Sequence, residues 1–363
     1  MLETGFEEVL GLSSEQGRGP PGRGRRTLPR REATVTAQSL DVKTVSELVA
    51  EAAAAPSLHN AQPWTFRFLR DSAVLHLYAD LQRTLPRTDP DKRGLHLGCG
   101  AALFNLRVAA AAAGLAPVVR LLPDPGDATL LAEVGLRGSA PPDETLARLH
   151  PAISRRHSSR LPFRDEEIPV GVAERLCDAA QAEGAQLLFP GAWHVKSILE
   201  LVQDAEGREA LDSGVLGETA QWARTEPSGT LGAPDGIPAE AFGPRQRGTA
   251  ASVRDFAAGR PMPGRGWASF EKNPHIAVLG TARDEPADWL RAGQALERVL
   301  LQATTDGLVA SVTSQPLEWP ELRWTARDPL SGMVHVQMVL RLGYGPEGHP
   351  SPRRPVAELL DIV

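Results

Sequence analysis

The sequence has few residues that could form covalent cross-links or metal sites. It holds two cysteines in 363 residues, Cys99 and Cys177, and they share no close spacing. Such a pair fits neither a disulfide framework nor a zinc site, and it suits the reducing cytoplasm. The nine histidines are scattered along the chain, so we expect no metal centre.

The motifs of several common enzyme classes are also missing. The chain has no G-x-x-x-x-G-K-[ST] loop, no G-x-S-x-G elbow and no H-E-x-x-H motif, and no pair of carboxylates stands out. Residues 98–100, Gly-Cys-Gly, suggest a dinucleotide fingerprint, but no strand precedes them and no acidic residue follows at the required distance. We therefore name no catalytic residue.

A strong positive charge is lacking too. The net charge is −6 and the pI is about 5.9, so we expect neither nucleic acid nor a membrane as a partner. Residues 1–38 differ, because six arginines lie between Arg18 and Arg31 without the apolar stretch of a secretion signal. We interpret this segment as a disordered tail, or as translation from an upstream start codon, rather than as a nucleic-acid arm. We expect the protein to be cytoplasmic.

One hydrophobic stretch, residues 95–119, is nearly long enough to span a membrane. Asn105 and Arg107 lie at its centre, and alanine and glycine dominate it. These features predict a buried helix of a soluble protein instead.

The apolar periodicity predicts an α+β protein built from a repeated unit. In the first unit, a helix near 45–55 is followed by two alternating strands, the alanine-rich helix and a further strand after Pro117. In the second, a helix and strand at 171–189 are followed by a strand at 274–281, a helix at 289–311 that ends at a Gly-Leu pair, and a strand at 333–345. We interpret residues 39–150 and 151–363 as two diverged copies of one unit.

The second unit contains an insertion at about 225–267 that is rich in glycine and proline. A loop of this length in a compact unit is usually functional or disordered. It is either a lid over a pocket, which would bury Phe242, Phe256 and Trp267, or a solvated linker.

Two short basic segments could bind an anion. "SRRHSSRLPF" at 154–163 mixes arginines with serines, a combination that suits a phosphate, although for this segment on its own a solvated basic turn is the better interpretation. "SPRRPVAEL" at 351–359 places two more arginines before a short helix.

These segments, together with "APSLHNAQPWTF" at 55–66, resemble the nitroreductase superfamily of FMN-dependent oxidoreductases. Members carry a helix that ends in Ala-Pro-Ser-x-x-Asn-x-Gln-Pro-Trp-x-Phe, and residues 55–66 match every fixed position. They also carry an Arg-[His/Arg]-Ser-x-[Arg/Lys]-x-Phe element, which 156–163 follows with one extra residue. A Leu-Gly-Tyr strand and an Arg-Pro pair match 342–344 and 354–355. The likeness covers about residues 40–360.

The resemblance implies the nitroreductase fold, with antiparallel-rich sheets surrounded by helices. In an ordinary member, one subunit supplies the Arg-Ser element and a C-terminal arginine to each flavin site, and its partner supplies the Pro-Ser-x-x-Asn turn. Here the first copy has the turn and the second has the arginines. We interpret the chain as a fused pseudo-dimer, similar to the single-chain Acg-like branch, that kept one of two flavin sites and is monomeric.

The implied cofactor is FMN. Arg156, Arg160 and Arg354 would pair with its phosphate while Ser158 donates a hydrogen bond. Asn60 would bond the polar edge of the flavin, unless it is only a turn residue. The full predicted cofactor-binding set is Pro56, Ser57, Asn60, Gln62, Arg155, Arg156, His157, Ser158, Arg160, Thr313, Ser314, Gln315, Arg353 and Arg354, of which the three residues 313–315 rest on the resemblance alone.

The implied function is an FMN-dependent oxidoreductase. It would transfer a hydride from NAD(P)H and reduce a nitroaromatic, a quinone or another conjugated acceptor in ping-pong order. The alternative is a protein that binds or stores FMN, with the flavin covered by the insertion and little turnover.

Overall fold

The structure is a computed structural model. It describes residues 40–137, 140–225, 233–247, 253–258, 260, 262–329, 331–333 and 335–363. The tail predicted at residues 1–38 lies outside the described residues. Residues 39–363 form a single unit.

The first half of this unit starts with an amphipathic helix. Val45, Leu48 and Val49 are buried on one face of α1, and Asp41 caps the helix by accepting a hydrogen bond from Thr44 N at 2.7 Å. The elements of this half are α1 (Val42–Ala53), η1 (Leu58–Asn60), β1 (Trp64–Leu69), β2 (Val74–Ala79), η2 (Leu81–Arg83), α2 (Arg93–Ala112), β3 (Val118–Leu121), β4 (Leu130–Gly135), α3 (Glu144–Ala147) and α4 (His150–Ile153).

The second half repeats this sequence of elements with a long addition after its first strand. It consists of α5 (Val170–Gln181), β5 (Gln186–Leu188), α6 (Ala192–Leu211), α7 (Ser213–Trp222), β6 (Ala223–Arg224), β7 (Ile237–Pro238), η3 (Ala239–Phe242), β8 (Arg245–Arg247), β9 (Trp267–Ser269), β10 (His275–Thr281), α8 (Pro286–Thr305), β11 (Val309–Thr313), η4 (Gln315–Leu317), α9 (Pro320–Thr325), β12 (His335–Gly343), α10 (Val356–Leu359) and β13 (Leu360–Ile362).

The helix predicted at 289–311 is shorter in the structure. Gly307 adopts a φ of 79°, and Leu308 N donates to Ala303 O at 2.8 Å, which is the pattern of a Schellman end. Residues 309–311 of the predicted helix form the start of β11 instead. The Gly-Leu pair therefore marked the end of the helix correctly, but the strand after it was missed.

The two halves contain sheets with the same strand order. The first sheet runs β13-β1-β2-β4-β3 and the second runs β11-β12-β10-β5. When both are read from the strand that follows the first helix, the orders β1-β2-β4-β3 and β5-β10-β12-β11 correspond, and every one of these neighbouring pairs is antiparallel. The predicted α+β class with antiparallel-rich sheets is confirmed.

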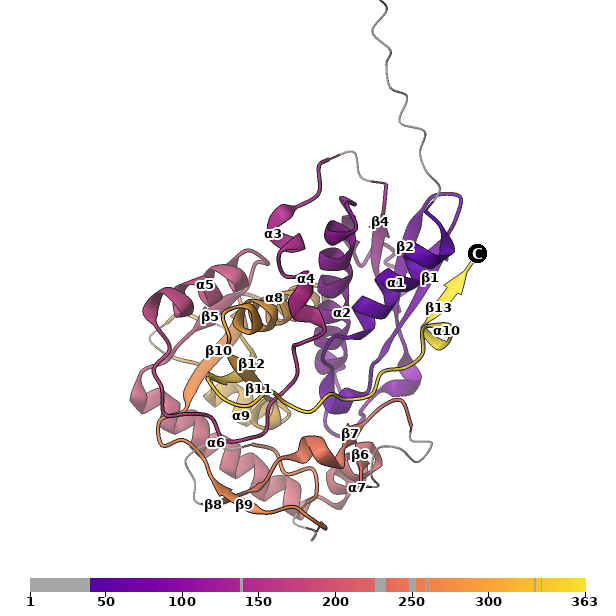
Figure 1. Ribbon diagram of the computed structural model, residues 1–363. Coiled ribbons are helices and arrows are strands. Elements are labelled where there is room, and N and C mark those ends of the chain that lie inside the picture. Colours follow the sequence, from indigo (N-terminus) through magenta and orange to yellow (C-terminus); the bar gives the residue numbers. More distant parts are fainter. Residues whose placement is uncertain are drawn as a thin grey trace, which may run out of the picture. The chain divides into compact units, whose positions relative to one another are not determined.

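The C-terminal strand belongs to the opposite half of the chain. β13 pairs in parallel with β1, with Phe66 beside Leu360 and Phe68 beside Ile362. Figure 1 shows the yellow C-terminal segment running past the second half to reach β1. This path carries the arginines at 353 and 354 to the turn that follows α1.

Helices α2 and α8 cross at the centre of the unit, where two glycines meet (Figure 1). A Cβ on Gly100 would lie 2.3 Å from Leu290 O, and a Cβ on Gly293 would lie 2.2 Å from Leu97 O. The contact is reciprocal, and it needs glycine because any side chain would collide with the facing backbone. The predicted core helix is therefore buried between helices and sheets. It is long and apolar enough to cross a membrane by composition, but 89% of that stretch is buried within the protein.

The insertion begins earlier than the sequence indicated. The segment between β5 and β10 covers 189–274, whereas the corresponding strands β1 and β2 are joined by the short turn 70–73. Besides the predicted loop, this segment contains α6 and α7. Glu218 of α7 docks it onto the first half by accepting hydrogen bonds from Thr88 N at 2.9 Å and Thr88 Oγ1 at 2.7 Å.

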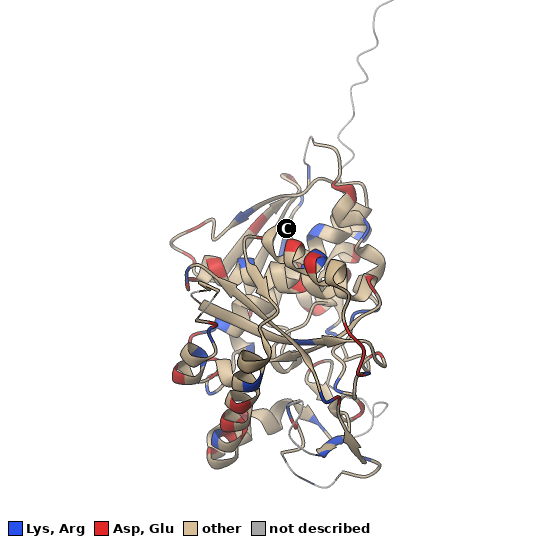
Figure 2. Cartoon of the chain, turned by 90° about the vertical axis from the view of Figure 1, so that its left-hand side faces the viewer, with Lys and Arg blue, Asp and Glu red and all other residues tan. Residues whose placement is uncertain are grey.

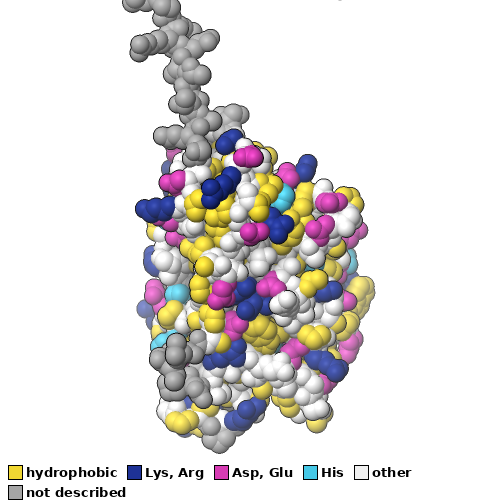
Figure 3. Space-filling model, turned by 90° about the vertical axis from the view of Figure 1, so that its right-hand side faces the viewer, with side chains coloured by type: hydrophobic (Ala, Val, Ile, Leu, Met, Phe, Trp, Pro, Cys, Tyr) yellow, Lys and Arg dark blue, Asp and Glu magenta, His cyan; other side chains and the backbone are white. Residues whose placement is uncertain are grey.

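Charged side chains of both signs are interspersed in the views of the unit. Lys and Arg positions lie scattered among Asp and Glu positions along the ribbon in Figure 2. On the face in Figure 3, they are mixed with small hydrophobic areas.

Candidate functional site

The turn after α1 has an unusual backbone. Three of its residues adopt positive φ without being glycine: His59 at 51°, Asn60 at 54° and Gln62 at 53°. Asparagine tolerates this conformation, but for histidine and glutamine it is uncommon and costs energy. Ser57 closes the turn, since its Oγ accepts a hydrogen bond from Gln62 N at 2.9 Å. Strained backbone of this kind persists only where the surroundings fix it.

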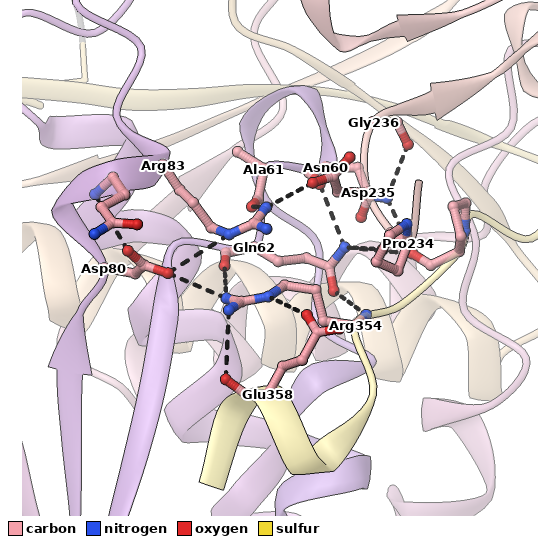
Figure 4. Close-up of polar contacts among 12 residues, drawn as sticks. Asn60, Ala61, Gln62, Asp80, Arg83, Pro234, Asp235, Gly236, Arg354 and Glu358 are labelled. Atoms are coloured by element: carbon pink, nitrogen blue, oxygen red, sulfur yellow. Dashed lines mark hydrogen bonds and ion pairs between the residues drawn. The ribbon is translucent and has the colours of Figure 1, made fainter. Parts of the chain in front are cut away.

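The side chains of Asn60 and Gln62 provide that fixation (Figure 4). Asn60 Nδ2 donates to Gly236 O of the insertion at 2.9 Å and to Pro352 O of the C-terminal segment at 3.0 Å. Gln62 Nε2 donates to Pro234 O at 2.8 Å. Both amides thus join the turn to two distant parts of the chain.

The two C-terminal arginines are also bound within the protein. Arg354 N donates to Gln62 Oε1 at 2.8 Å, and its guanidinium lies 3.3 Å from Asp80 Oδ2 (Figure 4). Arg353 donates to Asn60 Oδ1 at 3.0 Å and to Ala54 O at 2.9 Å. Burial, and secondly the charge of Arg156, lowers the pKa of Arg353 to about 9.

Arg156 shares these surroundings. Its Nη2 donates to Ala54 O at 3.0 Å, so two guanidinium groups meet the negative C-terminal end of α1. Its Nε lies 3.3 Å from Glu297 Oε1 on α8. Burial raises the pKa of Glu297 to about 7, although Arg156 opposes this shift.

A cavity beside the turn, called here the main pocket, contains about 870 Å³ of empty space, which includes its opening to solvent. The first half contributes the turn and the start of α2, and the second half contributes β11, the loop after it and the Arg-Ser element. Its lining includes Pro56, Ser57, Leu58, His59, Thr88, Asp89, Arg93, Gly94, Leu97, Gly98, Ser158, Arg160, Ile237, Arg254, Phe256, Leu296, Ser311, Val312, Ser314, Gln315, Glu318 and Met338.

Two glycines of α2 let the turn approach the helix. A Cβ on Gly98 would lie 3.1 Å from Ser57 Cβ, and one on Gly94 would lie 3.1 Å from Leu58 Cδ2. Asp89 anchors the start of the same helix by accepting hydrogen bonds from Gly94 N and Leu95 N, both at 2.8 Å. Burial raises the pKa of Asp89, and these two hydrogen bonds oppose the shift.

A second pocket adjoins the first at Ser158, which lines both. Arg155, Arg156 and His157 contribute its cationic and polar side, and Thr304 and Gly307 lie at the end of α8. We call this the basic pocket.

The insertion forms one wall of the main pocket. Arg254 binds Glu318 through two hydrogen bonds, at 2.7 and 2.9 Å, and binds Glu209 of α6 at 2.8 Å. Burial raises the pKa of Glu209 to about 7, and Arg254 acts against this change. Phe256 and Phe242 are buried as predicted, but Trp267 is 56% exposed, so the prediction for Trp267 is wrong.

The predicted cofactor residues separate into three groups. The main pocket brings together Pro56, Ser57, Ser158, Arg160, Ser314 and Gln315. The basic pocket holds Arg155, Arg156 and His157, again with Ser158. Neither pocket is lined by Asn60, Gln62, Thr313, Arg353 or Arg354.

Several pocket residues were not found from the sequence. His59 occupies a variable position inside the matched motif, and Arg254 lies in the glycine- and proline-rich insertion, where no pattern distinguishes it. Asp89 and Arg93 precede or start α2 and carry no motif. Their approach to the turn depends on tertiary packing.

Comparison with known proteins identifies the family, although no family model matches the chain. The protein named "Putative NAD(P)H nitroreductase Rv3131" of Mycobacterium tuberculosis is 33% identical over 329 residues, which cover 89% of this chain and 92% of that protein. "Putative NAD(P)H nitroreductase acg" of the same organism is 28% identical over 329 residues, with 88% and 95% covered. The chain belongs to the nitroreductase family, in agreement with the motifs.

Solved structures give weaker similarities. The FMN and NADPH-dependent nitroreductase NfnB from Sphigopyxis sp. strain HMH is 16% identical with a TM-score of 0.37, over 59% of this chain and 97% of that one. A BluB-like flavoprotein from Clostridium difficile 630 is 14% identical with a TM-score of 0.39, over 59% and 98%. The family assignment rests on the sequence relatives.

Proposed function

We propose that the protein is an FMN-dependent NAD(P)H oxidoreductase with one flavin site per chain. The observation that carries this proposal is the main pocket itself. It joins the Pro56-Ser57 turn of the first half to the Arg-Ser element of the second, as the resemblance implies for a flavin site. The related mycobacterial proteins carry names of NAD(P)H nitroreductases, which supports the same activity.

The chemistry of the residues that line the two pockets suits FMN. The main pocket has apolar walls such as Leu296 and Met338 for a flat ring and polar groups such as Ser314 and Arg160 for its edge. The basic pocket offers Arg155 and His157 to a phosphate. Since Ser158 lines both pockets, it would contact the part of FMN that links the flavin ring to the phosphate.

This arrangement revises the phosphate contacts proposed from the sequence. Arg353 and Arg354 bind backbone oxygens and carboxylates and line neither pocket. We assign to them, and to Asn60 and Gln62, the role of holding the turn in its strained conformation. Arg156 faces the basic pocket while it also binds Ala54 O.

Bound FMN would supply two-electron chemistry, accepting a hydride from NAD(P)H and delivering two electrons to a nitroaromatic, a quinone or another conjugated acceptor. The protein would hold the flavin ring between Pro56 and Ser57 on one side and β11 on the other, and it would exclude water with the insertion. Arg160 carries a positive charge at the pocket and would favour an electron-rich, reduced ring.

We further infer that the chain is a fused pseudo-dimer that acts as a monomer in the cytoplasm. The matching order of four strands in each of the two sheets supports the pseudo-dimer, and so does the reciprocal contact of Gly100 and Gly293 across the central helices. Reciprocal contacts of this kind are the property of a two-fold interface.

One observation favours the storage alternative. Phe256 and Arg254 of the insertion line the main pocket, and a nicotinamide would have to enter beside them. Steady-state turnover with NADPH and menadione decides between the two. Continuous oxidation of NADPH is expected of the enzyme, whereas flavin that stays oxidised under excess NADPH would indicate storage.

A further inference from the structure

His59 is a buried polar side chain without a partner. It lines the main pocket and is 3% exposed, yet neither Nδ1 nor Nε2 has a hydrogen-bond partner among the described residues. Buried polar groups in folded proteins are nearly always hydrogen-bonded. The exception at a pocket wall indicates that a ligand completes the bonding of the imidazole.

The surroundings keep this imidazole neutral. Burial holds the pKa of His59 well below its usual value of 6.5, and the positive charges of Arg254 and Arg160 lower it further. A neutral imidazole offers one N–H donor and one acceptor nitrogen. The ring of Phe256 meets it edge-to-face with centroids 5.5 Å apart, which restricts its orientation.

The backbone also holds His59 in place. Its φ of 51° is strained, and the flanking turn is fixed by the bonds of Asn60 to Gly236 O and Pro352 O. Strain of this kind is common at functional sites. The imidazole is therefore positioned beside the insertion wall before any ligand arrives.

We propose that His59 contacts the electron acceptor and donates a hydrogen bond to a carbonyl or nitro oxygen of a planar aromatic substrate. The proposal rests on the proposed function. His59 contacts Phe256 of the insertion, at the wall that the cofactor assignments leave free, so the acceptor and not the flavin is its partner. Quinones and nitroaromatics, the acceptors of the proposed function, carry such an oxygen.

The test measures binding without turnover. FMN-loaded protein is titrated with 4-nitrobenzoate in the absence of NAD(P)H, and the change in flavin absorbance gives the Kd. His59→Phe keeps a ring against Phe256 but removes the N–H, so the Kd is expected to rise about tenfold, with the Kd of FMN unchanged. His59→Asn keeps a donor and suits the positive φ, so it should regain most of the affinity.

A matched control is His96→Phe. His96 is a buried imidazole outside the pocket whose Nδ1 is already bonded to Lys92 O at 2.7 Å, and its replacement should leave the Kd of 4-nitrobenzoate unchanged. If His59→Phe does not fold, His59→Ala takes its place in the comparison with His59→Asn.

Three outcomes would overturn the inference. If the wild-type protein binds FMN and oxidises NADPH, an unchanged Kd of 4-nitrobenzoate in the His59→Phe variant would contradict this inference alone. A parallel loss of FMN affinity would place His59 against the flavin. Failure of the wild-type chain to take up FMN would remove the proposed function, and this inference with it.

Discussion

The turns that follow the first helix of each half show what distinguishes a binding site from packed structure. After α1, Gly98 of the neighbouring central helix lies beside Ser57, and both line the main pocket. In the second half, the residue two positions before the crossing glycine of α8 is Arg291 rather than glycine. Its Cδ lies 3.9 Å from where a Cβ of Gly184 would be, at the turn after α5.

The second turn is occupied by ion pairs. Glu183, beside Gly184, binds Arg107 of α2 and, at 2.8 Å, Arg298 of α8. The two halves share strand order and helix packing, so the framework alone does not make a site. The difference lies in a few side chains, because glycines of α2 let the first turn pack closely at the edge of the main pocket, whereas arginines surround the second turn.

Replacing a glycine beside the first turn by arginine should have the largest effect on FMN binding. Gly98→Arg places beside Ser57 the side chain that the second half has at Arg291, and it should reduce FMN affinity by about 100-fold or more, equivalent to about 2.7 kcal/mol. Fluorescence titration of FMN measures the loss, and circular dichroism checks the fold. Wild-type affinity in a folded Gly98→Arg variant would contradict the account of the pocket.

The second-largest effect is expected on the free energy of unfolding, when contacts that hold the first turn are removed. Arg354→Ala removes one of the two arginine partners of Asp80 and the donor to the carbonyl of Gln62, and it should cost about 2 kcal/mol of unfolding free energy. Because Arg354 lines neither pocket, FMN and riboflavin should weaken equally. Urea denaturation and two ligand titrations provide the measurements.

Arg155→Ala tests the basic pocket, as Arg354→Ala tests an arginine that lines neither pocket. It should weaken FMN about tenfold, as expected for one charged hydrogen bond of about 1.5 kcal/mol, and leave riboflavin unaffected. Equal weakening of the two ligands would show that the phosphate lies elsewhere.

The contact between the halves also predicts a pH dependence. Since burial raises the pKa of Glu297 from 4.5 to about 7, the folded protein holds this proton more tightly than the unfolded chain does. Its contribution to stability is complete below pH 4.5 and is lost as the pH rises through about 7. The Tm should therefore fall by a few degrees between pH 5 and pH 8. Glu297→Gln should make this fall smaller, and an unchanged slope would contradict the assignment.

The smallest effect on stability is expected from a substitution in the second half of the chain. Arg291→Ala removes a half-exposed contact with Asp288 and should change unfolding free energy by about 0.5 kcal/mol or less. It should not create a second FMN site, because Glu183 and its two arginine partners remain. Binding of a second FMN by this variant would show that Arg291 alone closes the site.

The sequence predicted the repeated α+β unit and the importance of the turn, because both leave local patterns. Periodicity marked six of the nine strands in the two main sheets, and Asn60 and Gln62 stood in a motif. The partners of these residues could not be predicted, since Gly236 and Pro352 are far away in the chain. For the same reason, the arginines of the basic segments suggested a phosphate, whereas Ala54 O and Glu297 bind Arg156.

The stoichiometry of FMN tests the central claim most directly. Purified protein reconstituted with excess FMN and freed of unbound flavin should contain one FMN per chain, as measured by flavin absorbance against amino-acid analysis. It should elute as a monomer in the same experiment. Two FMN per chain would contradict the account of the filled second turn, and the absence of FMN would contradict the assignment of the main pocket.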